Sequence, residues 1–446
     1  MIVLKNANII NLYPPQVEKN LDVVIKGNKI ASKGNHSPQE SKDKQKSKDI
    51  KVIDCSGKYV SPGLVCSHNH FYSMLARGIM AGIKPSKDFI GILKNLWWRL
   101  DTALDEESLY YSAITGALEA IKCGTTAVID HNASPSFIRG SLSTLKTCFL
   151  KAGLRGILCY EVTDRNGKPG ALEGVEESVD LIKSIDCGNL KSKEDSLVEG
   201  AIGAHALFTL SDDSLKLISH AVSETKRGIH IHAAEDQFDS SYSHRYHEMD
   251  IVERLESFGL LNEKAILAHG VHLKENEIEL MNKYSSFLVH NPRSNMNNSV
   301  GYSDKLSLID NLTLGTDGIG SDMLEELKMG FFKSSDARSP LILTRLIQAL
   351  QNGNMILERY FGQNFGRVEE GFTADLVIFD YNSPTPVVSE NLPGHLAFGL
   401  SSKNVETVII NGRIVMESGE FPFDTHPIYE KSRKQASRLW EKIKAG

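Results

Sequence analysis

Eight short apolar runs alternate with longer amphipathic segments through the middle of the chain. The runs lie at residues 64–68, 125–130, 155–160, 198–203, 228–233, 265–269, 286–290 and 312–315. The segments between them have helical spacing: residues 107–124 carry apolar residues at i, i+3, i+4 and i+7 and end in glycine. Eight short strands that alternate with helices predict a (β/α)₈ TIM-type barrel.

The two ends of the chain have a different pattern, typical of antiparallel hairpins. Residues 22–32 place apolar stretches on both sides of a Gly-Asn pair, and residues 405–420 do the same around Asn-Gly. We expect both ends to pair in one small flanking β-sandwich, with the charged stretch 37–49 as a solvated connection. The predicted domains are 1–58 (N-terminal part of the sandwich), 59–364 (barrel) and 365–446 (C-terminal part with a terminal helix).

Composition narrows the classes of partner. The 446 residues are 41% hydrophobic and 24% charged, with a formal net charge of −6, which offers no basic surface for nucleic acid. No apolar run approaches the roughly 18 residues that span a bilayer, and the start lacks the pattern of a signal peptide. The six cysteines have no CxxC spacing. These features predict reduced thiols in a cytoplasmic protein, with no nucleic-acid or membrane partner.

More than half of the 15 histidines fall at or just after the predicted strand ends. They are His68, His70, His131, His205, His230, His232, His269 and His290. Barrel enzymes build their active sites at the carboxyl ends of the strands, so this concentration favours a functional centre. Five further histidines are expected at the surface: His36, His220, His244, His395 and His426.

The first run ends in His-Asn-His. Because strand side chains alternate faces, His68 and His70 point the same way and Asn69 points away. Alone, the pair fits either a metal clamp or two unrelated polar residues. His232 and Asp317 end the fifth and eighth runs, and strand eight of a barrel closes against strand one, so all four can converge. Such a set suits a catalytic metal ion that keeps one position open for a water whose pKa falls to about 7.

Two more residues in these segments suit proton transfer. Glu235 lies three residues after His232 and can move protons without binding metal. His269, at the end of the sixth run, can hydrogen-bond an oxygen that develops negative charge. Cys66, two residues before His68, is the one thiol placed to line a pocket.

Five motifs, in this order and spacing, resemble the amidohydrolase superfamily: PGLVCSHNH, HIHAAE, AHGVHL, HNPRSN and LGTDG. The nearest branch is that of the mononuclear aminohydrolases, which includes guanine, S-adenosylhomocysteine and triazine enzymes. Stretches such as LVCSHNHFYSMLARGIMAGI resemble more narrowly the SsnA group of aminohydrolases, whose substrate the resemblance does not fix. The likeness covers nearly the whole chain.

The resemblance implies roles for these positions. One divalent metal ion per chain, zinc foremost and iron as the alternative, would be held by His68, His70, His232 and Asp317. Asp317 would also act as a base, Glu235 would protonate a ring nitrogen and then the leaving amine, and His269 would orient the hydroxide. Binuclear members carry a bridging lysine at the end of strand four, where this chain reads AIGAHALF, so one metal is favoured.

Contacts to the substrate are predicted for four residues: His205, His131, Trp97 and His290. Trp97 and Trp98 are adjacent, and neighbouring helical positions point about 100° apart, so at most one of them is expected to stack on a ring. Arg165 has two interpretations, as a partner for a substrate carboxylate or carbonyl and as a surface residue.

The predicted function is a metal-dependent aminohydrolase that deaminates a nitrogen heterocycle such as a purine-like compound. Two alternatives remain open: opening of a ring at an endocyclic amide or amidine, and a catalytically inactive binding protein. The predicted partner is the small heterocyclic substrate, and a homodimer is expected from base rates for barrels.

Overall fold

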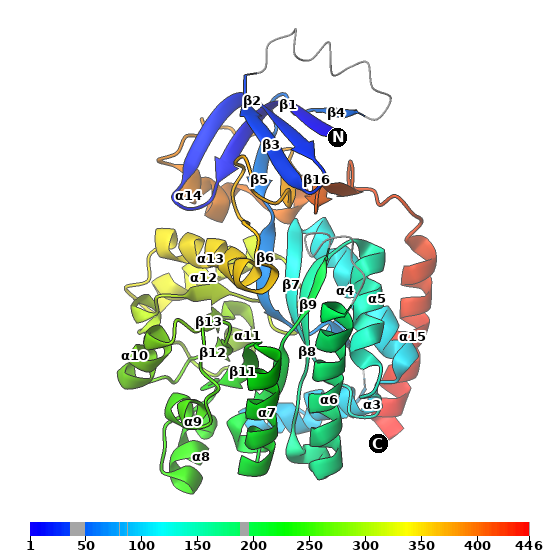
Figure 1. Cartoon of the computed structure of the whole chain (residues 1–446), viewed down its shortest axis with the longest axis vertical. Coiled ribbons are helices and arrows are strands. Elements are labelled where there is room, and N and C mark those ends of the chain that lie inside the picture. The colour runs from blue at the N-terminus through cyan, green and yellow to red at the C-terminus, as the bar shows by residue number, and fades with distance from the viewer. Residues whose placement is uncertain (36–49, 80, 87, 188–195, 446) are drawn as a thin grey trace.

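A barrel and a flanking sheet make up the computed structural model, which describes residues 1–35, 50–79, 81–86, 88–187 and 196–445 (Figure 1). The predicted connection at 37–49 therefore lies outside the described residues. The arrangement confirms the predicted fold class of a barrel with a β unit built from both chain ends.

Every apolar run of the sequence forms a strand of the barrel. The strands are β6 (Leu64–Asn69), β7 (Thr125–Asn132), β8 (Arg155–Tyr160), β9 (Val198–Gly200), β10 (Ile202–Ala206), β11 (Ile229–Ala233), β12 (Ile266–His269), β13 (Phe287–His290) and β14 (Leu312–Leu314). The fourth run is divided at Ala201 into β9 and β10. Strands β6 to β9 form one parallel sheet and β10 to β14 another.

Two parallel bridges close these sheets into a barrel. Val162 pairs with Ala204 between the third and fourth positions, and Asn69 pairs with Asp317 between the first and eighth. The backbone N–H groups of Thr316 and Asp317 both donate to the carbonyl oxygen of His68, at 3.0 and 3.1 Å. Strand eight therefore meets strand one at the residues that the sequence singled out.

Helices surround the barrel and cover its carboxyl end. The main ones are α2 (Phe89–Ile92), η2 (Leu93–Trp97), α3 (Trp98–Ala103), α4 (Glu106–Lys122), α5 (Ser141–Ala152), α6 (Gly167–Asp186), α7 (Asp212–Thr225), α8 (Gln237–His247), α9 (Ile251–Ser257), α10 (Glu275–Lys283), α11 (Pro292–Asn297), α12 (Met323–Asp336) and α13 (Leu343–Phe361). The predicted helix at 107–124 is α4. Asp105 caps its N-terminus, because the Asp105 side chain accepts a hydrogen bond from the backbone N–H of Ser108.

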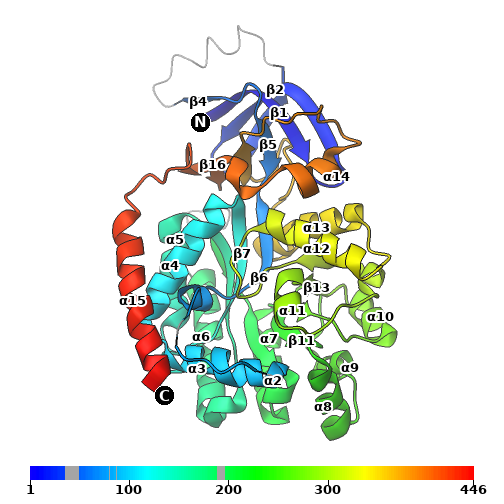
Figure 2. The same ribbon diagram turned by 180° about the vertical axis from the view of Figure 1, so that it is seen from behind.

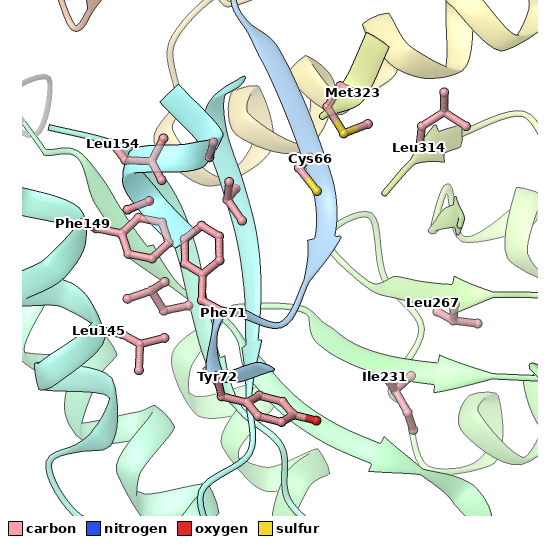
Figure 3. Close-up of a cluster of buried hydrophobic side chains, with 14 of the residues drawn as sticks. Cys66, Phe71, Tyr72, Leu145, Phe149, Leu154, Ile231, Leu267, Leu314 and Met323 are labelled. Carbon is pink, nitrogen blue, oxygen red and sulfur yellow. The ribbon is translucent and has the colours of Figure 1, made fainter. Parts of the chain in front are cut away.

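The segment that directly follows β6 is anchored in the hydrophobic core. Phe71, directly after His70, is fully buried, and its ring centroid lies 5.3 Å from that of Phe149 (Figure 3). A side chain at Gly116 would lie 2.6 Å from the Phe71 ring, so α4 can approach only because that position has no Cβ. Cys66 is also fully buried, and its thiol contacts Thr316 Oγ1 at 3.2 Å rather than a cavity.

The flanking unit joins both ends of the chain in one sheet. Its strands are β1 (Ile2–Asn11), β2 (Gln16–Lys26), β3 (Lys29–Gly34), β4 (Lys51–Asp54), β5 (Tyr59–Pro62), β15 (Leu376–Phe379), β16 (Val405–Ile410) and β17 (Arg413–Met416). Hydrogen bonds connect them in the order β17-β16-β15-β5-β1-β2-β3, with β4 on β1. Both predicted hairpins are present, and Asn411 and Gly412 have the positive φ angles that an Asn-Gly turn requires. Residues 59–62, which the sequence assigned to the barrel, form β5 and pair in this sheet. The predicted domain boundaries stay predictions.

The C-terminal helix α15 (His426–Ala445) runs back along the barrel beside α4 (Figures 1 and 2). Its Trp440 Nε1 donates to the carbonyl oxygen of Leu75 at 2.7 Å, in the segment that follows the His-Asn-His motif. Among the described residues, no helix combines the length and the apolar character needed to cross a membrane. The surface prediction for His395 is wrong: this ring is 9% exposed, because it packs beside Tyr381 and bonds to its hydroxyl at 3.0 Å.

Candidate active site

Four predicted metal ligands converge at the carboxyl end of the barrel. His68 lies in β6, His70 directly follows that strand, His232 belongs to β11, and Asp317 follows β14. One ligand atom from each lies within 4.8 Å of the others. His70 Nε2 is 3.0 Å from Asp317 Oδ1 and 3.1 Å from His232 Nε2, while His68 Nε2 is 3.6 Å from Asp317 Oδ1.

The far side of each imidazole is held by a hydrogen bond. His70 Nδ1 lies 2.6 Å from the carbonyl oxygen of His131, and His232 Nδ1 lies 2.8 Å from that of His205. A carbonyl can only accept, so both Nδ1 atoms carry the proton and both Nε2 atoms face the cluster. His68 Nδ1 lies 2.8 Å from His230 Nε2. Such contacts orient metal-binding histidines and fix their tautomers.

The donor set fits a cation. His68 Nε2 is buried and has no hydrogen-bond partner, and burial lowers the pKa of His68 to about 3, so its ring presents a lone pair. Burial also lowers the pKa of His70, but the Asp317 carboxylate outweighs it and raises that pKa to about 9. The residues alone thus place a positive charge beside Asp317, and three imidazoles with one carboxylate are a suitable zinc ligand set.

Asn69 holds strand eight in register with the ligands. Its side-chain amide donates to Thr316 Oγ1 at 2.8 Å and to the carbonyl oxygen of Asp317 at 2.9 Å. Asp317 has a φ of +53°, an uncommon conformation for a residue with a side chain. The alternation expected of the motif is therefore present, with two histidines toward the cluster and the asparagine bracing Asp317 from the other side.

Glu235 and His269 lie on one side of the ligands. His269 Nε2 is 3.6 Å from Glu235 Oε2 and 4.0 Å from Asp317 Oδ2, and its Nδ1 is 2.8 Å from Asn295 Oδ1. Asn298 donates to Glu235 Oε1 at 3.4 Å. Burial raises the pKa of Glu235 to about 7, and the nearby Asp317 adds to this effect. Glu235 is thus suited to hold a proton near neutral pH.

A cavity opens beside these residues. It is lined by His70, Tyr72, Phe89, Leu93, Trp97, Trp98, Asp101, Glu161, His205, Ala206, Phe208, His232, Glu235, Asp239, Asn298, Asp317 and Gly318. Of the predicted substrate contacts, His205 and Trp97 line it, and His131 and His290 do not. Trp98 lines it as well as Trp97, and the expectation that at most one of them stacks on a ring stays a prediction. The chain there winds through the wider π-helical turn η2 (Leu93–Trp97), which changes the angle between successive side chains.

Three acids of the cavity wall are absent from the sequence predictions: Asp101, Glu161 and Asp239. Glu161 directly follows β8, so the strand-end rule applied to acids would have found it. Its Oε2 lies 3.1 Å from His131 Nδ1, which places His131 behind the wall. His205, although buried, reaches the cavity and bonds through Nδ1 to Thr209 Oγ1 at 2.9 Å.

Known proteins resemble the chain over nearly its whole length. The sequence model of the amidohydrolase family matches residues 59–415. A 5-methylthioadenosine/S-adenosylhomocysteine deaminase of Thermococcus sibiricus is 30% identical over 426 residues, which cover 93% of this chain and 94% of that protein. A 5′-deoxyadenosine deaminase of Methanococcus maripaludis is 30% identical over 443 residues, which cover 96% and 97%.

The fold has solved counterparts too. A crystal structure of an adenosine deaminase from Xanthomonas campestris with bound zinc superimposes with a TM-score of 0.83 at 20% identity, covering 98% of each chain. At that identity the likeness concerns the fold alone. The family match spans well over half of the chain. The chain therefore belongs to the amidohydrolase family, and it is a hydrolase that acts on carbon–nitrogen bonds other than peptide bonds.

Proposed function

We propose that this protein removes an exocyclic amino group from a purine-like heterocycle and releases ammonia. The observation that carries the proposal is the convergence of four metal-ligand side chains with Glu235 and His269 at a cavity lined by two tryptophans. Aromatic faces suit planar heterocycles. The curated relatives named as deaminases of adenosine derivatives support the same chemistry.

The proposed metal site consists of His68, His70, His232 and Asp317. We propose zinc as the ion, because three imidazoles and a carboxylate suit it, with ferrous iron as the alternative. When bound, such an ion lowers the pKa of a water molecule to about 7 and so supplies the nucleophile at neutral pH. The carboxyl end of β10, where a second metal would need a bridging lysine, carries His205 instead.

Glu235 is the proposed proton donor. It lies in the cavity wall, and its raised pKa of about 7 keeps a fraction protonated in the working range. Protonation of a ring nitrogen by Glu235 makes the adjacent amino-bearing carbon more electrophilic. When the adduct collapses, Glu235 takes up the proton of the added hydroxyl group and passes it to the amine, which leaves as ammonia while the carbon keeps the oxygen as a carbonyl. The water proton held by Asp317 restores Glu235 for the next cycle. Asn298, which donates to Oε1, holds the carboxyl group in position.

Asp317 and His269 are the proposed pair that orients the attacking oxygen. Asp317 Oδ1 faces the histidines and Oδ2 faces Ser294 and His269. Oδ2 can therefore take the proton of the attacking water while Oδ1 remains a ligand. His269 Nε2 is buried and has no hydrogen-bond partner, so it is free to bond the oxygen as charge develops there.

Ammonia release tests the proposal directly. Zinc-loaded protein is mixed with 5′-deoxyadenosine, 5′-methylthioadenosine or guanine, and ammonia and product mass are measured. Deamination exchanges NH for oxygen, whereas the ring-opening alternative adds one water and keeps the nitrogen. If ligands bind with no change in their mass, the binding-protein alternative holds. The cytoplasmic location and the homodimer stay predictions from the sequence.

A further inference from the structure

The cavity beside the proposed metal site has a strongly acidic wall. Among the described residues that line it there are five carboxylates and no lysine or arginine. The acids are Asp101, Glu161, Glu235, Asp239 and Asp317. A divalent ion offsets two negative charges and the Arg165 guanidinium offsets that of Asp101, while burial raises the pKa values of Asp101, Glu235 and Asp239 to about 7. An anionic group on a bound molecule would meet these acids in a buried setting, with no lysine or arginine among the described lining residues to pair with it.

Arg165, the cation that the sequence offered for a substrate carboxylate, is paired with Asp101 through Nη2, while its buried Nε has no hydrogen-bond partner. Its Nη2 donates to Asp101 Oδ2 at 2.8 Å, and its guanidinium carbon lies 4.6 Å from the centre of the Trp98 ring. Arg165 is not among the residues that line the cavity, whereas Asp101 and Trp98 both are. A ligand therefore meets the carboxylate of this ion pair and the indole that covers the guanidinium.

Two polar atoms of this end of the cavity lack partners. Asp101 is 2% exposed, and its Oδ1 makes no hydrogen bond. Trp98 Nε1 is also buried without a partner. Buried polar atoms are normally paired, so an unpaired acceptor and an unpaired donor on two residues of the same cavity wall indicate where a ligand group bonds. A hydroxyl, an amide or an amine can donate to Asp101 Oδ1; a carboxylate cannot.

Asp101 and Trp98 belong to α3, which covers the carboxyl end of the barrel (Figure 2). The segment from α2 to α3 runs across the carboxyl ends of the barrel strands (Figure 2). The ligand histidines lie at the strand ends themselves, and Asp101 reaches the cavity from the covering helix. A substrate whose amino-bearing carbon lies at the metal site would thus present its far substituent to Asp101.

We infer that Asp101 selects a neutral or cationic, hydrogen-bond-donating substituent at the far end of the substrate and rejects a carboxylate there. The inference rests on the proposed deaminase function and deepens it. Among purine nucleosides, the protein should therefore prefer those whose far substituent is uncharged or carries an amino group over those whose far substituent is acidic.

A matched pair of substrates tests it: adenosine 5′-carboxamide and adenosine 5′-carboxylate, which share a shape and differ in charge. With zinc-loaded wild-type protein, we expect kcat/KM for the carboxamide to exceed that for the carboxylate about tenfold or more. Asp101→Asn should bring the two values together, because the amide neither repels the carboxylate nor accepts as strongly. Asp213→Asn, which alters an exposed acid paired with Lys168, is the control and should leave the ratio unchanged.

The Arg165→Gln variant distinguishes whether Asp101 or Arg165 recognises the far substituent of the substrate. If Asp101 is the selector, the preference for the carboxamide persists in Arg165→Gln. Equal or better turnover of the carboxylate by wild-type protein, lost in Arg165→Gln, would overturn the inference and make Arg165 the residue that binds the anion. The wild-type comparison stands even if a variant fails to fold.

Calorimetric binding of both compounds distinguishes failure of the inference from failure of the proposed function. If no ammonia forms from any nucleoside, the proposed function fails, and tighter binding of the carboxamide still supports the role of Asp101. If the protein deaminates 5′-deoxyadenosine and binds both tails equally, or neither, the inference fails and the proposed function remains.

Discussion

His70 and His232 direct their Nε2 atoms at each other across 3.1 Å, although each already bonds a backbone carbonyl through Nδ1. Two neutral rings in these tautomers would oppose lone pairs, so the contact requires a positive charge between or beside them. The carboxylate oxygen Asp317 Oδ1, 3.0 Å from His70 Nε2, also favours a positive charge at this point. In the protein alone, a proton on His70 supplies that charge, and a bound divalent metal ion would take the place of the proton.

Glu235→Gln should abolish turnover and leave the metal content unchanged. Glu235 Oε2 lies 3.6 Å from His269 Nε2, Glu235 is not one of the four proposed ligands, and glutamine cannot supply a proton. Loss of a general acid typically lowers kcat by about 10²–10⁴-fold. Steady-state ammonia release measures the loss of turnover, and elemental analysis of the same sample measures the metal content. Metal loss in this variant would show that Glu235 is a ligand, and retained activity would remove its role as acid.

Asn69→Ala should weaken metal binding without touching a ligand. The Asn69 amide donates to Thr316 Oγ1 and to the carbonyl oxygen of Asp317, so its removal frees Asp317 to move. Loss of such a bracing contact typically costs about 10–100-fold in metal affinity. Competition with a fluorescent chelator measures it. Asn132→Ala, which removes another buried asparagine at the end of β7, is the control, and equal losses in both variants would contradict the assignment.

Asp239→Asn should remove part of the pH dependence of stability. Burial raises the pKa of Asp239 to about 7, and the bond from Ala234 N–H opposes this only in part. Between pH 3.8, its ordinary pKa, and about 7 the native state keeps a proton that the unfolded chain releases, so stability falls as pH rises through this window.

Asparagine keeps the acceptor for Ala234 N–H and cannot ionise. Denaturant titrations at pH 4 and pH 8 should therefore show a variant near wild type at the lower pH and more stable by about 2–4 kcal/mol at the higher. Asp213→Asn at the exposed Lys168 pair serves as the control. A variant less stable than wild type at pH 8 would mean that the Asp239 carboxylate is paired in the native state.

Arg155→Met should destabilise the junction between barrel and flanking sheet. Arg155 is fully buried and donates through Nε and Nη2 to Asp375 at 2.7 and 3.1 Å. Removal of one partner leaves a buried carboxylate unpaired, which typically costs about 3–5 kcal/mol. Urea unfolding of Arg155→Met, Asp375→Asn and the double variant measures the coupling. Additive losses would show that the pair contributes nothing as a unit.

The barrel strands and the convergence of the four proposed ligands could be predicted from the sequence because both depend on simple rules of strand geometry. Strand alternation places His68 and His70 on one face, and strand-end positions collect His232 and Asp317. The residues that shape the cavity depend on chain paths that no local pattern fixes. Asp101 and both tryptophans reach the cavity from η2 and α3, the segment that runs across the strand ends.

Other differences come from tertiary context. His395 has the surroundings of a surface residue in the sequence, but Tyr381 folds over it. The strand four region divides at Ala201, since its two halves pair with different neighbours, β8 and β11.

Metal content per chain tests the central claim most directly. Protein purified without chelator should hold about one equivalent of zinc or iron by elemental analysis, and His232→Ala should lose it. Two equivalents would contradict a mononuclear site and favour the ring-opening alternative. No metal, even after incubation with zinc, would contradict the assignment of His68, His70, His232 and Asp317 as ligands.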